Sequence, residues 1–278
     1  MTGLPKLSDR LGFVAGALLA LVALGCGPSY SARAKLGLTI YCPGAGNVDF
    51  GDAGIREGLN AAGYRGEVAT YVWTISFNPA IDQVVRVNAR LRASALARQI
   101  ENYIDDYVKN ADGGPPPQLN LVGLSAGSGV AIWALEDLKP GYQVDNVILL
   151  GSSLWYRYDV SKALPRIRGK IYNYYSSNDI VLAGPMKVFG TIDGVFADDG
   201  AGAVGLRPER GADRIVNIPW KPDYEKYGYY GGHMDSTSPM FVRQVLSQHL
   251  LPRPGPSAAP RTAAPSPPPK APRAERPS

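Results

Sequence analysis

The chain has 278 residues, of which 45% are hydrophobic and 19% charged, so it can bury a core in one large domain or two small ones. Its formal net charge of +5 belongs to its ends, because residues 1–25 carry one net positive charge, residues 252–278 carry four, and the segment between them is neutral. With a neutral central segment, nothing basic in the part expected to fold suggests a nucleic-acid-binding domain.

The first 25 residues have the pattern of an export signal. Lys6 and Arg10 precede an uninterrupted apolar run of 15 residues, LGFVAGALLALVALG, which ends at Cys26. This run is short for a membrane span, which needs about 20 residues, and is typical of a signal peptide. The sequence VALGC at 22–26 resembles the lipobox of bacterial lipoproteins, with Ala23 and Leu24 in the reverse of the commonest order.

That resemblance implies that residues 1–25 are a lipoprotein signal peptide and that Cys26 carries the lipid. The protein would then be exported and anchored to the bacterial cell envelope on its extracytoplasmic side, with the membrane as a partner through the lipidated N-terminus. Ordinary secretion and an uncleaved anchor are the alternatives. Cys42, the other cysteine, lies in the apolar sequence LTIYC and is expected to be a buried strand residue rather than a nucleophile.

Strand and helix patterns alternate from residue 36 to residue 251. Strands are predicted at 36–41, 66–73, 119–124, 144–150, 170–175 and 215–218. Helices are predicted at 53–62, 126–138 and 239–250, with a long and mostly helical stretch at 81–109. Ser238 and Pro239 suit the N-cap and first position of the last helix, whereas residues 192–214 show no period and are expected to be irregular.

This alternation predicts an α/β fold, a three-layer sandwich with a mainly parallel sheet and helices on both faces. The sequences LNLVGL and NVILLG are continuous apolar runs, as expected for parallel strands that are buried on both sides. Functional sites in such sheets form at the carboxyl ends of the strands. No phosphate-binding or dinucleotide-binding glycine motif is present, and the sequence predicts neither a cofactor nor a metal site.

A serine interrupts the chain where one predicted strand meets a predicted helix. The sequence GLSAG at 123–127 fits the pattern GxSxG, in which a serine occupies a very tight turn. Gly123 and Gly127 remove the side chains that would crowd such a turn. The geometry would hold the hydroxyl of Ser125 clear of the backbone, near the positive end of the following helix. Ser125 is therefore predicted to be a nucleophile.

A serine hydroxyl needs a neighbouring base, and a third group must orient that base. Of the two histidines, His249 lies in the last turn of the terminal helix and is expected to cap that helix end. His233 lies in the glycine-containing loop YYGGHMDST and is predicted to be the base. Asp179, which follows a predicted strand, is preferred as the third group over two rivals, Asp159 and Asp235.

Negative charge that develops on an attacked carbonyl needs backbone N–H donors. One donor is predicted at Ala126, directly after the serine. The second is predicted at Ala45, in the loop YCPGAGN after the first strand, where Gly44 and Gly46 let the backbone turn toward the substrate. A plain tight turn is the alternative for this loop.

In this combination the chain resembles the α/β-hydrolase superfamily across residues 36–251. GLSAG, SSNDIVL and GGHMD match its nucleophile elbow, acid loop and histidine loop, in the order of that family. The resemblance implies a catalytic domain with a Ser-His-Asp triad and an acyl-enzyme intermediate, in a compact form similar to cutinases and small lipases that lacks the two leading strands. Its loop after the first strand has Pro-Gly-Ala without the usual histidine.

Aromatic residues in two sets are expected near the same edge. Trp155, Tyr156 and Tyr158 follow the strand after the serine, and Tyr224, Tyr227, Tyr229 and Tyr230 precede His233. A cleft that they lined would suit an acyl chain, an aromatic ester or a sugar ester, with Gly44, Gly46, Trp155 and Tyr230 touching the substrate. Ordinary packing is the alternative for these side chains.

The two ends complete the predicted organisation. Residues 26–35 are expected to be a short tether, and residues 252–278, which contain ten of the 24 prolines, a disordered basic tail. The preferred function is cleavage of a small-molecule or lipid carboxylic ester. An acyltransferase or peptidase with the same triad, or a non-catalytic envelope lipoprotein that uses the fold as a binding module, are the alternatives.

Overall fold

A computed structural model describes residues 30–47, 51–74, 86–111 and 115–251 of the chain. The predictions for the signal peptide, for lipidation of Cys26 and for the basic tail lie outside these residues. Within them, no helix is both long enough and apolar enough to cross a bilayer.

Six parallel strands form the centre of the molecule. In chain order they are β1 (Leu38–Cys42), β2 (Glu67–Thr70), β3 (Leu119–Leu124), β4 (Asn146–Leu150), β5 (Ile171–Tyr175) and β6 (Ile215–Pro219). They are ordered β2-β1-β3-β4-β5-β6 across the sheet, and every neighbouring pair is parallel. All six strands therefore end at one edge of the sheet, the carboxyl edge, where the predicted site residues should meet.

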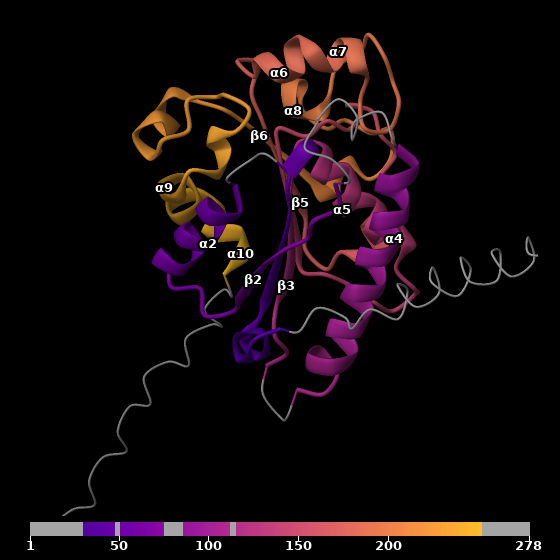
Figure 1. Ribbon diagram of the computed structural model, residues 1–278, viewed down its shortest axis with the longest axis vertical. Helices are drawn as coiled ribbons and strands as arrows, with labels where there is room; N and C mark the ends of the chain where they lie inside the picture. The colour runs from indigo at the N-terminus through magenta and orange to yellow at the C-terminus, as the bar shows by residue number, and fades with distance from the viewer. Residues whose placement is uncertain (1–29, 48–50, 75–85, 112–114, 252–278) are drawn as a thin grey trace, which may run out of the picture.

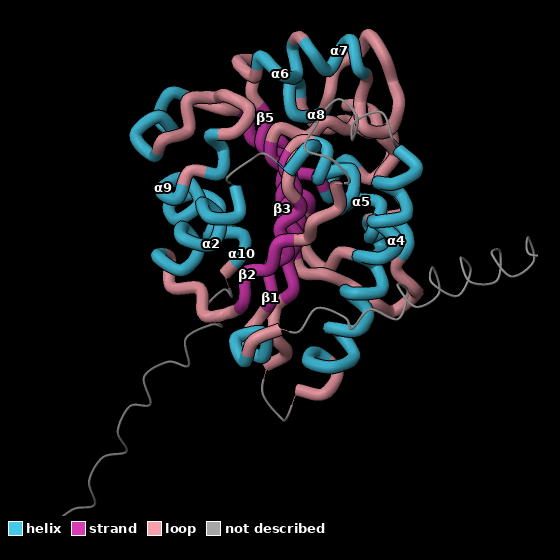
Figure 2. The backbone as a smooth tube through the Cα atoms, in the orientation of Figure 1, coloured by secondary structure: helices cyan, strands magenta, loops and turns pink. Residues whose placement is uncertain are grey.

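Helices cover both faces of this sheet (Figures 1 and 2). One face carries α4 (Arg86–Tyr103) and α5 (Ala126–Asp137). The other carries α2 (Gly51–Ala61) and a C-terminal helical segment made of α9 (Pro239–Phe241), the π-helical turn Val242–Leu246 and α10 (Ser247–Leu250). The predicted α/β fold, a three-layer sandwich with a mainly parallel sheet and helices on both faces, is confirmed.

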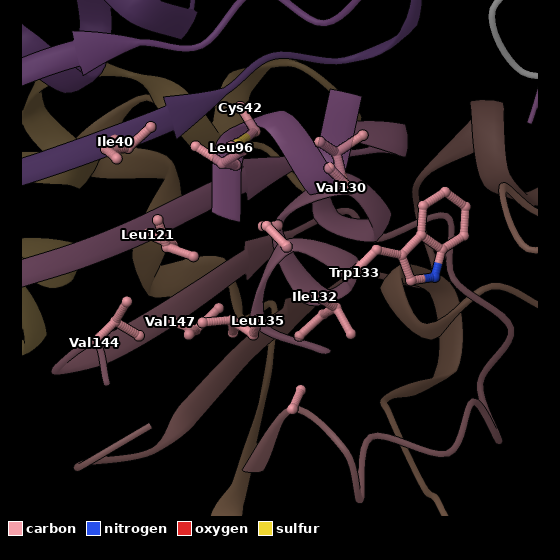
Figure 3. Close-up of a cluster of buried hydrophobic side chains, with 14 of the residues drawn as sticks. Ile40, Cys42, Leu96, Leu121, Val130, Ile132, Trp133, Leu135, Val144 and Val147 are labelled. Atoms are coloured by element: carbon pink, nitrogen blue, oxygen red, sulfur yellow. The ribbon is translucent and has the colours of Figure 1, made fainter. Parts of the chain in front are cut away.

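Burial on both faces explains the continuous apolar strands. Successive side chains of a strand point to opposite faces, so Leu119 and Leu121 of β3 join the core under α4 and α5, whereas Val122 and Leu124 join the core under α2. Figure 3 shows the first core, in which Leu121 and Val147 of the sheet lie toward Leu135 of α5. The two cores hold β3 and β4 rigidly at the centre of the molecule.

Short helical elements fill the connections. They are η1 (Ala32–Leu36), η2 (Ala45–Asn47), the π-helical turn Ile104–Val108, η4 (Leu164–Arg166), α6 (Ile180–Ala183), α7 (Pro185–Phe189), α8 (Ala201–Val204), η5 (Ala212–Arg214), η6 (Pro222–Tyr227) and η7 (Asp235–Thr237). Figure 1 shows α6, α7 and α8 together above the carboxyl edge. The sequence did not predict α6 or α7, because four or five residues are too few to show a helical period.

Several local predictions change in the structure. Tyr30 packs edge-on against Tyr103 and Ala34 is fully buried, so the described part of the expected tether belongs to the packed domain. Ser238 does occupy the N-cap position of α9, but its hydroxyl donates to the carbonyl of Tyr227 at 2.8 Å instead of capping the helix. The His249 ring stacks on Tyr172 with ring centroids 3.8 Å apart, an aromatic contact that the prediction of a cap did not foresee.

Candidate active site

Ser125 lies between β3 and α5 in a backbone conformation that L residues rarely adopt, with φ 52° and ψ −123°. A residue held in such a region costs about 1 to 3 kcal/mol, so the surrounding structure must enforce it. The Ser125 N–H donates to Leu150 O at 2.9 Å, and its carbonyl accepts from the N–H groups of Ser128 at 3.1 Å and Ser153 at 3.2 Å. These bonds hold the serine at the end of β3 from both sides.

The two glycines of the motif are required by close packing. A Cβ on Gly123 would lie 2.6 Å from Ser128 Cα, and one on Gly127 would collide with the carbonyl oxygens of Cys42 and Pro43. Gly127 thus allows the first turn of α5 to pack directly against the loop after β1. The prediction of a tight strand-to-helix turn at GLSAG is confirmed.

Asp179 and His233 are brought together from segments 54 residues apart. Asp179 follows β5 and is 2% exposed; its Oδ1 accepts from the N–H groups of Val181 and Leu182, each at 3.1 Å, and so caps α6. Its Oδ2 lies 2.6 Å from Nδ1 of His233, whose side chain is 8% exposed. A carboxylate can only accept, so Nδ1 of His233 is the donor of this hydrogen bond, and in the neutral form of the ring Nε2 is then the acceptor.

Gly151, which the sequence patterns did not single out, connects this pair to the serine. It follows Leu150 at the end of β4, and the carbonyl of Leu150 receives the Ser125 N–H. A Cβ built on Gly151 would lie 3.2 Å from Asp179 Oδ2 and 3.3 Å from His233 Nδ1. The Asp179–His233 pair therefore lies directly over Gly151, the residue that follows the Leu150 carbonyl to which Ser125 is hydrogen-bonded. Gly151 has φ 47°, and a glycine at the end of a predicted strand was the only signal for it.

The two rival aspartates have other partners. Asp235 Oδ2 accepts from the N–H groups of Tyr230 at 2.9 Å and Gly232 at 3.3 Å, which closes the loop that carries His233. Asp159 binds the Ser161 N–H and pairs with Arg210. These bonds to Ser161 and then to Arg210 lower the pKa of the Asp159 carboxyl. Of the three predicted candidates, Asp179 alone is hydrogen-bonded to His233 in the structure.

Helix α2 supports the histidine loop from below. A Cβ on Gly54 would collide with the carbonyl oxygen of Thr237, four residues after His233. A Cβ on Gly58 would lie 2.6 Å from Pro239 O and 2.5 Å from Val242 Cβ. The glycines of α2 thus let the histidine loop and the start of the C-terminal helix pack directly against the backbone of α2. This packing helps to position the loop that carries His233.

The loop after β1 lies beside the first turn of α5, where the second backbone donor was predicted. The indole of Trp73 donates to Pro43 O at 2.8 Å, and Gly46 has φ 78° within η2. Ala126 is buried as the first residue of α5, and Ala45 is partly exposed. The packing of Gly127 against Cys42 and Pro43 keeps the two segments in contact. Their roles as oxyanion donors, and that of Gly44 and Gly46 toward substrate, stay predictions.

The aromatic residues divide between packing and exposure. Tyr224 and Tyr229 are buried and stack against each other beside Phe241, which fits the packing alternative. Trp155 donates its indole N–H to Asp198 at 2.8 Å, whereas Tyr230 is 64% exposed. A substrate role for Trp155 and Tyr230 stays a prediction.

Cys42 is fully buried in β1, and burial raises the pKa of its thiol to about 12, which leaves no reactive thiolate at neutral pH. The predicted assignment of Cys42 to a buried strand is confirmed. In the described ranges, no group of three or more histidine, cysteine or acidic side chains is placed to hold a metal ion.

Comparison with known proteins gives structural likenesses only. No protein-family model matches the sequence, and no curated protein matches it. The chain is similar to a dienelactone hydrolase from Anabaena variabilis, with 18% identity over 77% of this chain and 85% of that one, at a TM-score of 0.41. It is also similar to the carboxylesterase CesB from Bacillus subtilis, with 12% identity over 81% and 85% of the two chains, at a TM-score of 0.39.

A third solved structure, that of TT1662 from Thermus thermophilus, is 14% identical over 77% of this chain and 87% of that one, at a TM-score of 0.45. Likenesses at such low identities and TM-scores assign no function to the chain.

Proposed function

We propose that the protein is a serine hydrolase that cleaves carboxylic esters, with Ser125 as nucleophile, His233 as base and Asp179 as the group that orients His233. One observation carries the proposal. Ser125 is held at φ 52° between β3 and α5 while the Asp179–His233 pair lies over the adjacent Gly151. Backbone strain at a serine is typical of a functional site and has no use in packing, and an imidazole oriented by a buried carboxylate over the neighbouring residue is the kind of base such a serine needs.

The chemistry follows from these positions. Ser125 Oγ attacks the ester carbonyl carbon while its proton passes to Nε2 of His233, and Asp179 stabilises the imidazolium that forms. The negative charge on the carbonyl oxygen is received by the backbone N–H groups of Ala126 and Ala45. His233 then returns the proton to the departing alkoxide, which leaves as an alcohol, and the acyl group remains on Ser125 as an ester. Attack by water, assisted in the same way, releases the carboxylic acid and restores Ser125.

The proposed setting comes from the N-terminal sequence. A signal peptide at residues 1–25 and a lipid on Cys26 would anchor the hydrolase at the extracytoplasmic side of the bacterial cell envelope. Growth of expressing cells with a radiolabelled fatty acid tests this proposal. The protein should acquire label, and Cys26→Ala should not; label on both or on neither would contradict a lipid at Cys26.

A fluorophosphonate probe tests the hydrolase directly, because it reacts with a serine only when a neighbouring base activates that serine. Wild-type protein should be labelled at Ser125, and Ser125→Ala should not be labelled. Ser128→Ala is the matched control, because Ser128 lies one turn further along α5 and its hydroxyl points back to the carbonyl of Ser125. A folded wild-type protein that resists the probe would favour the non-catalytic binding module.

A further inference from the structure

Exposed apolar side chains gather beside the Asp179–His233 pair. Twelve large hydrophobic side chains are exposed among the described residues, and five of them fall within the 17 residues from 180 to 196. A sixth directly follows His233. We call these six the apolar rim: Ile180 (78% exposed), Val181 (37%), Val188 (72%), Phe189 (42%), Phe196 (56%) and Met234 (42%). Single exposed hydrophobic residues are ordinary, but a group of them marks an interaction surface.

The members of the apolar rim are adjacent in space. Helix α6 packs against α7 and α8, and Figure 1 shows the three together above the carboxyl edge. A Cβ on Gly190 would lie 3.0 Å from the ring of Phe196, so this ring sits against the end of α7. Ile180 and Met234 each follow one member of the hydrogen-bonded Asp179–His233 pair. The rim therefore borders the proposed site directly.

Folding does not account for the outer side chains of this region. The inner face of α6 and α7 is already supplied by Leu182 and Met186, which are 1% and 5% exposed. A helical segment that is apolar on its outer face as well is expected where that face meets another apolar phase. The side chains of Ile180 and Val188 do not stabilise the fold of the isolated molecule, because most of their apolar area stays in contact with water.

The charges in this region indicate what kind of apolar environment contacts the outer face of α6 and α7. Lys187 is the one charged residue from 180 to 189, and it is paired with Asp199 at 3.1 Å. A surface that binds a charged polymer or an anionic headgroup would present several unpaired cations. Beside the rest of the rim, the guanidinium of Arg86 lies over the Phe196 ring, 5.4 Å from its centroid, and Asp193 and Asp198 accept N–H groups of Trp155. An apolar surface whose neighbouring charges are few and mostly partnered, placed beside the proposed nucleophile, instead fits the acyl region of a neutral lipid assembly.

We infer that the apolar rim docks the protein onto the surface of an assembled ester lipid, so that the substrate class is a water-insoluble acyl ester delivered to Ser125 from that surface. The inference rests on the proposed function, since docking supplies substrate only if Ser125 is the nucleophile. Docking itself needs no catalysis and can be measured separately. Insertion of an apolar face into the headgroup boundary is driven by the apolar area it buries.

Fluorescence quenching by lipid tests the docking without turnover. Phe189→Trp and the control Leu36→Trp are each placed in the full chain with Ser125→Ala, and the signal of the native tryptophans is subtracted with the Ser125→Ala parent. Leu36 is 51% exposed but ends η1, at the opposite edge of the sheet and near the beginning of the described chain. It therefore reports any contact made only through the N-terminal segment. The probe is a neutral phosphatidylcholine vesicle with brominated acyl chains.

The new tryptophan at 189 should lose roughly half of its emission, as expected for a side chain near the acyl boundary, while that at 36 keeps its emission. Quenching at 36 alone, equal quenching at both positions, or quenching at neither would overturn the inference. A dimer that forms without lipid and dissociates in Phe189→Ser would assign the rim to a second copy of the chain, and would overturn it too.

Kinetics provide the second test and separate the two proposals. The measured quantity is the ratio of hydrolysis of a long-chain ester in neutral micelles to hydrolysis of a soluble short-chain ester. In Val188→Ser with Phe189→Ser this ratio should fall by about tenfold, which corresponds to 1.4 kcal/mol of lost docking, whereas Leu36→Ser should leave it unchanged. An unchanged ratio in the rim variant overturns the docking alone. Failure of the wild type on the soluble ester overturns the proposed function, and the quenching result stands independently of it.

Discussion

The two edges of the sheet differ in backbone strain and in how their polar groups are used. At the amino edge, Asn120 is fully buried, donates to Leu250 O at 3.0 Å and accepts from the Asn146 N–H at 3.2 Å. Asp145 there accepts the Leu119 N–H at 2.8 Å and pairs with Arg168. At the carboxyl edge, Ser125 and Gly151 have positive φ, and the Asp179–His233 pair lies over Gly151.

The two ends of the same strands therefore have different roles: the amino edge contributes stability, and the carboxyl edge carries the proposed active site. The amino edge satisfies the ends of strands and of the C-terminal helix with short side chains, which is what a stabilising edge requires. The carboxyl edge keeps backbone strain at Ser125, which lowers stability, and exposed apolar side chains, which add none. Substitutions at the two edges should therefore affect different measurements, and the following predictions test that.

The largest effect is expected at Ser125. Ser125→Gly should abolish ester hydrolysis and fluorophosphonate labelling, since the nucleophile is gone. It should also raise the free energy of unfolding by roughly 1 kcal/mol, because glycine adopts φ 52° without strain. Denaturation by urea, followed by circular dichroism, measures the second effect against Ser125→Ala, which loses the hydroxyl but keeps the strain. Equal stability of the two variants would show that the turn is not strained.

Asp179→Asn should lower kcat/KM for a soluble ester by roughly 10² to 10⁴-fold, because an amide no longer fixes the protonated Nδ1 tautomer of His233. Labelling by fluorophosphonate should slow in parallel. Asp159→Asn is the matched control, since Asp159 pairs with Arg210 away from His233, and it should change neither rate. Comparable losses of kcat/KM in both variants would show that the hydrogen bond to His233 does not identify Asp179 as the orienting acid.

Gly151→Ala should lower kcat/KM by roughly 10 to 100-fold, because the new methyl group lies 3.2 to 3.3 Å from Asp179 Oδ2 and His233 Nδ1 and must displace them. Gly141→Ala is the control for backbone strain. Gly141 has φ 90°, and a methyl group there would meet nothing within 4 Å, so its variant should lose about 1 kcal/mol of stability and no activity. A similar kinetic loss in both would attribute the effect to strain alone.

Sequence patterns predicted the parts of this molecule that depend on local order. The strand predicted at 119–124 matches β3 to the residue, because a mostly apolar run marks a parallel strand buried on both faces. The strand predicted at 170–175 matches β5 to within one residue. The turn at GLSAG was predicted from Gly123 and Gly127, whose missing side chains are visible in the sequence itself.

Contacts between distant segments could not be predicted in the same way. Gly151 matters only because Asp179 and His233 fold over it, and His249 stacks on Tyr172 only because α10 returns to β5. Nor could the choice of Asp179 over Asp235 be made from spacing, since the bond of Asp235 to the Tyr230 N–H depends on the loop conformation. The order of the family motifs favoured Asp179, and the loop geometry supplied the physical reason.

The smallest effect on activity is expected from the amino edge. Asn120→Ala should leave kcat/KM for a soluble ester unchanged, because Asn120 lies near the start of the strand at whose far end Ser125 lies. It should lower the free energy of unfolding by about 1 to 3 kcal/mol, since the carbonyl of Leu250 and the N–H of Asn146 both lose a buried partner. Urea denaturation beside initial rates at a temperature well below the transition separates the two quantities. A kinetic loss as large as that of Gly151→Ala would mean that strain introduced at one edge reaches the other through β3, and the proposed division between the edges would then fail.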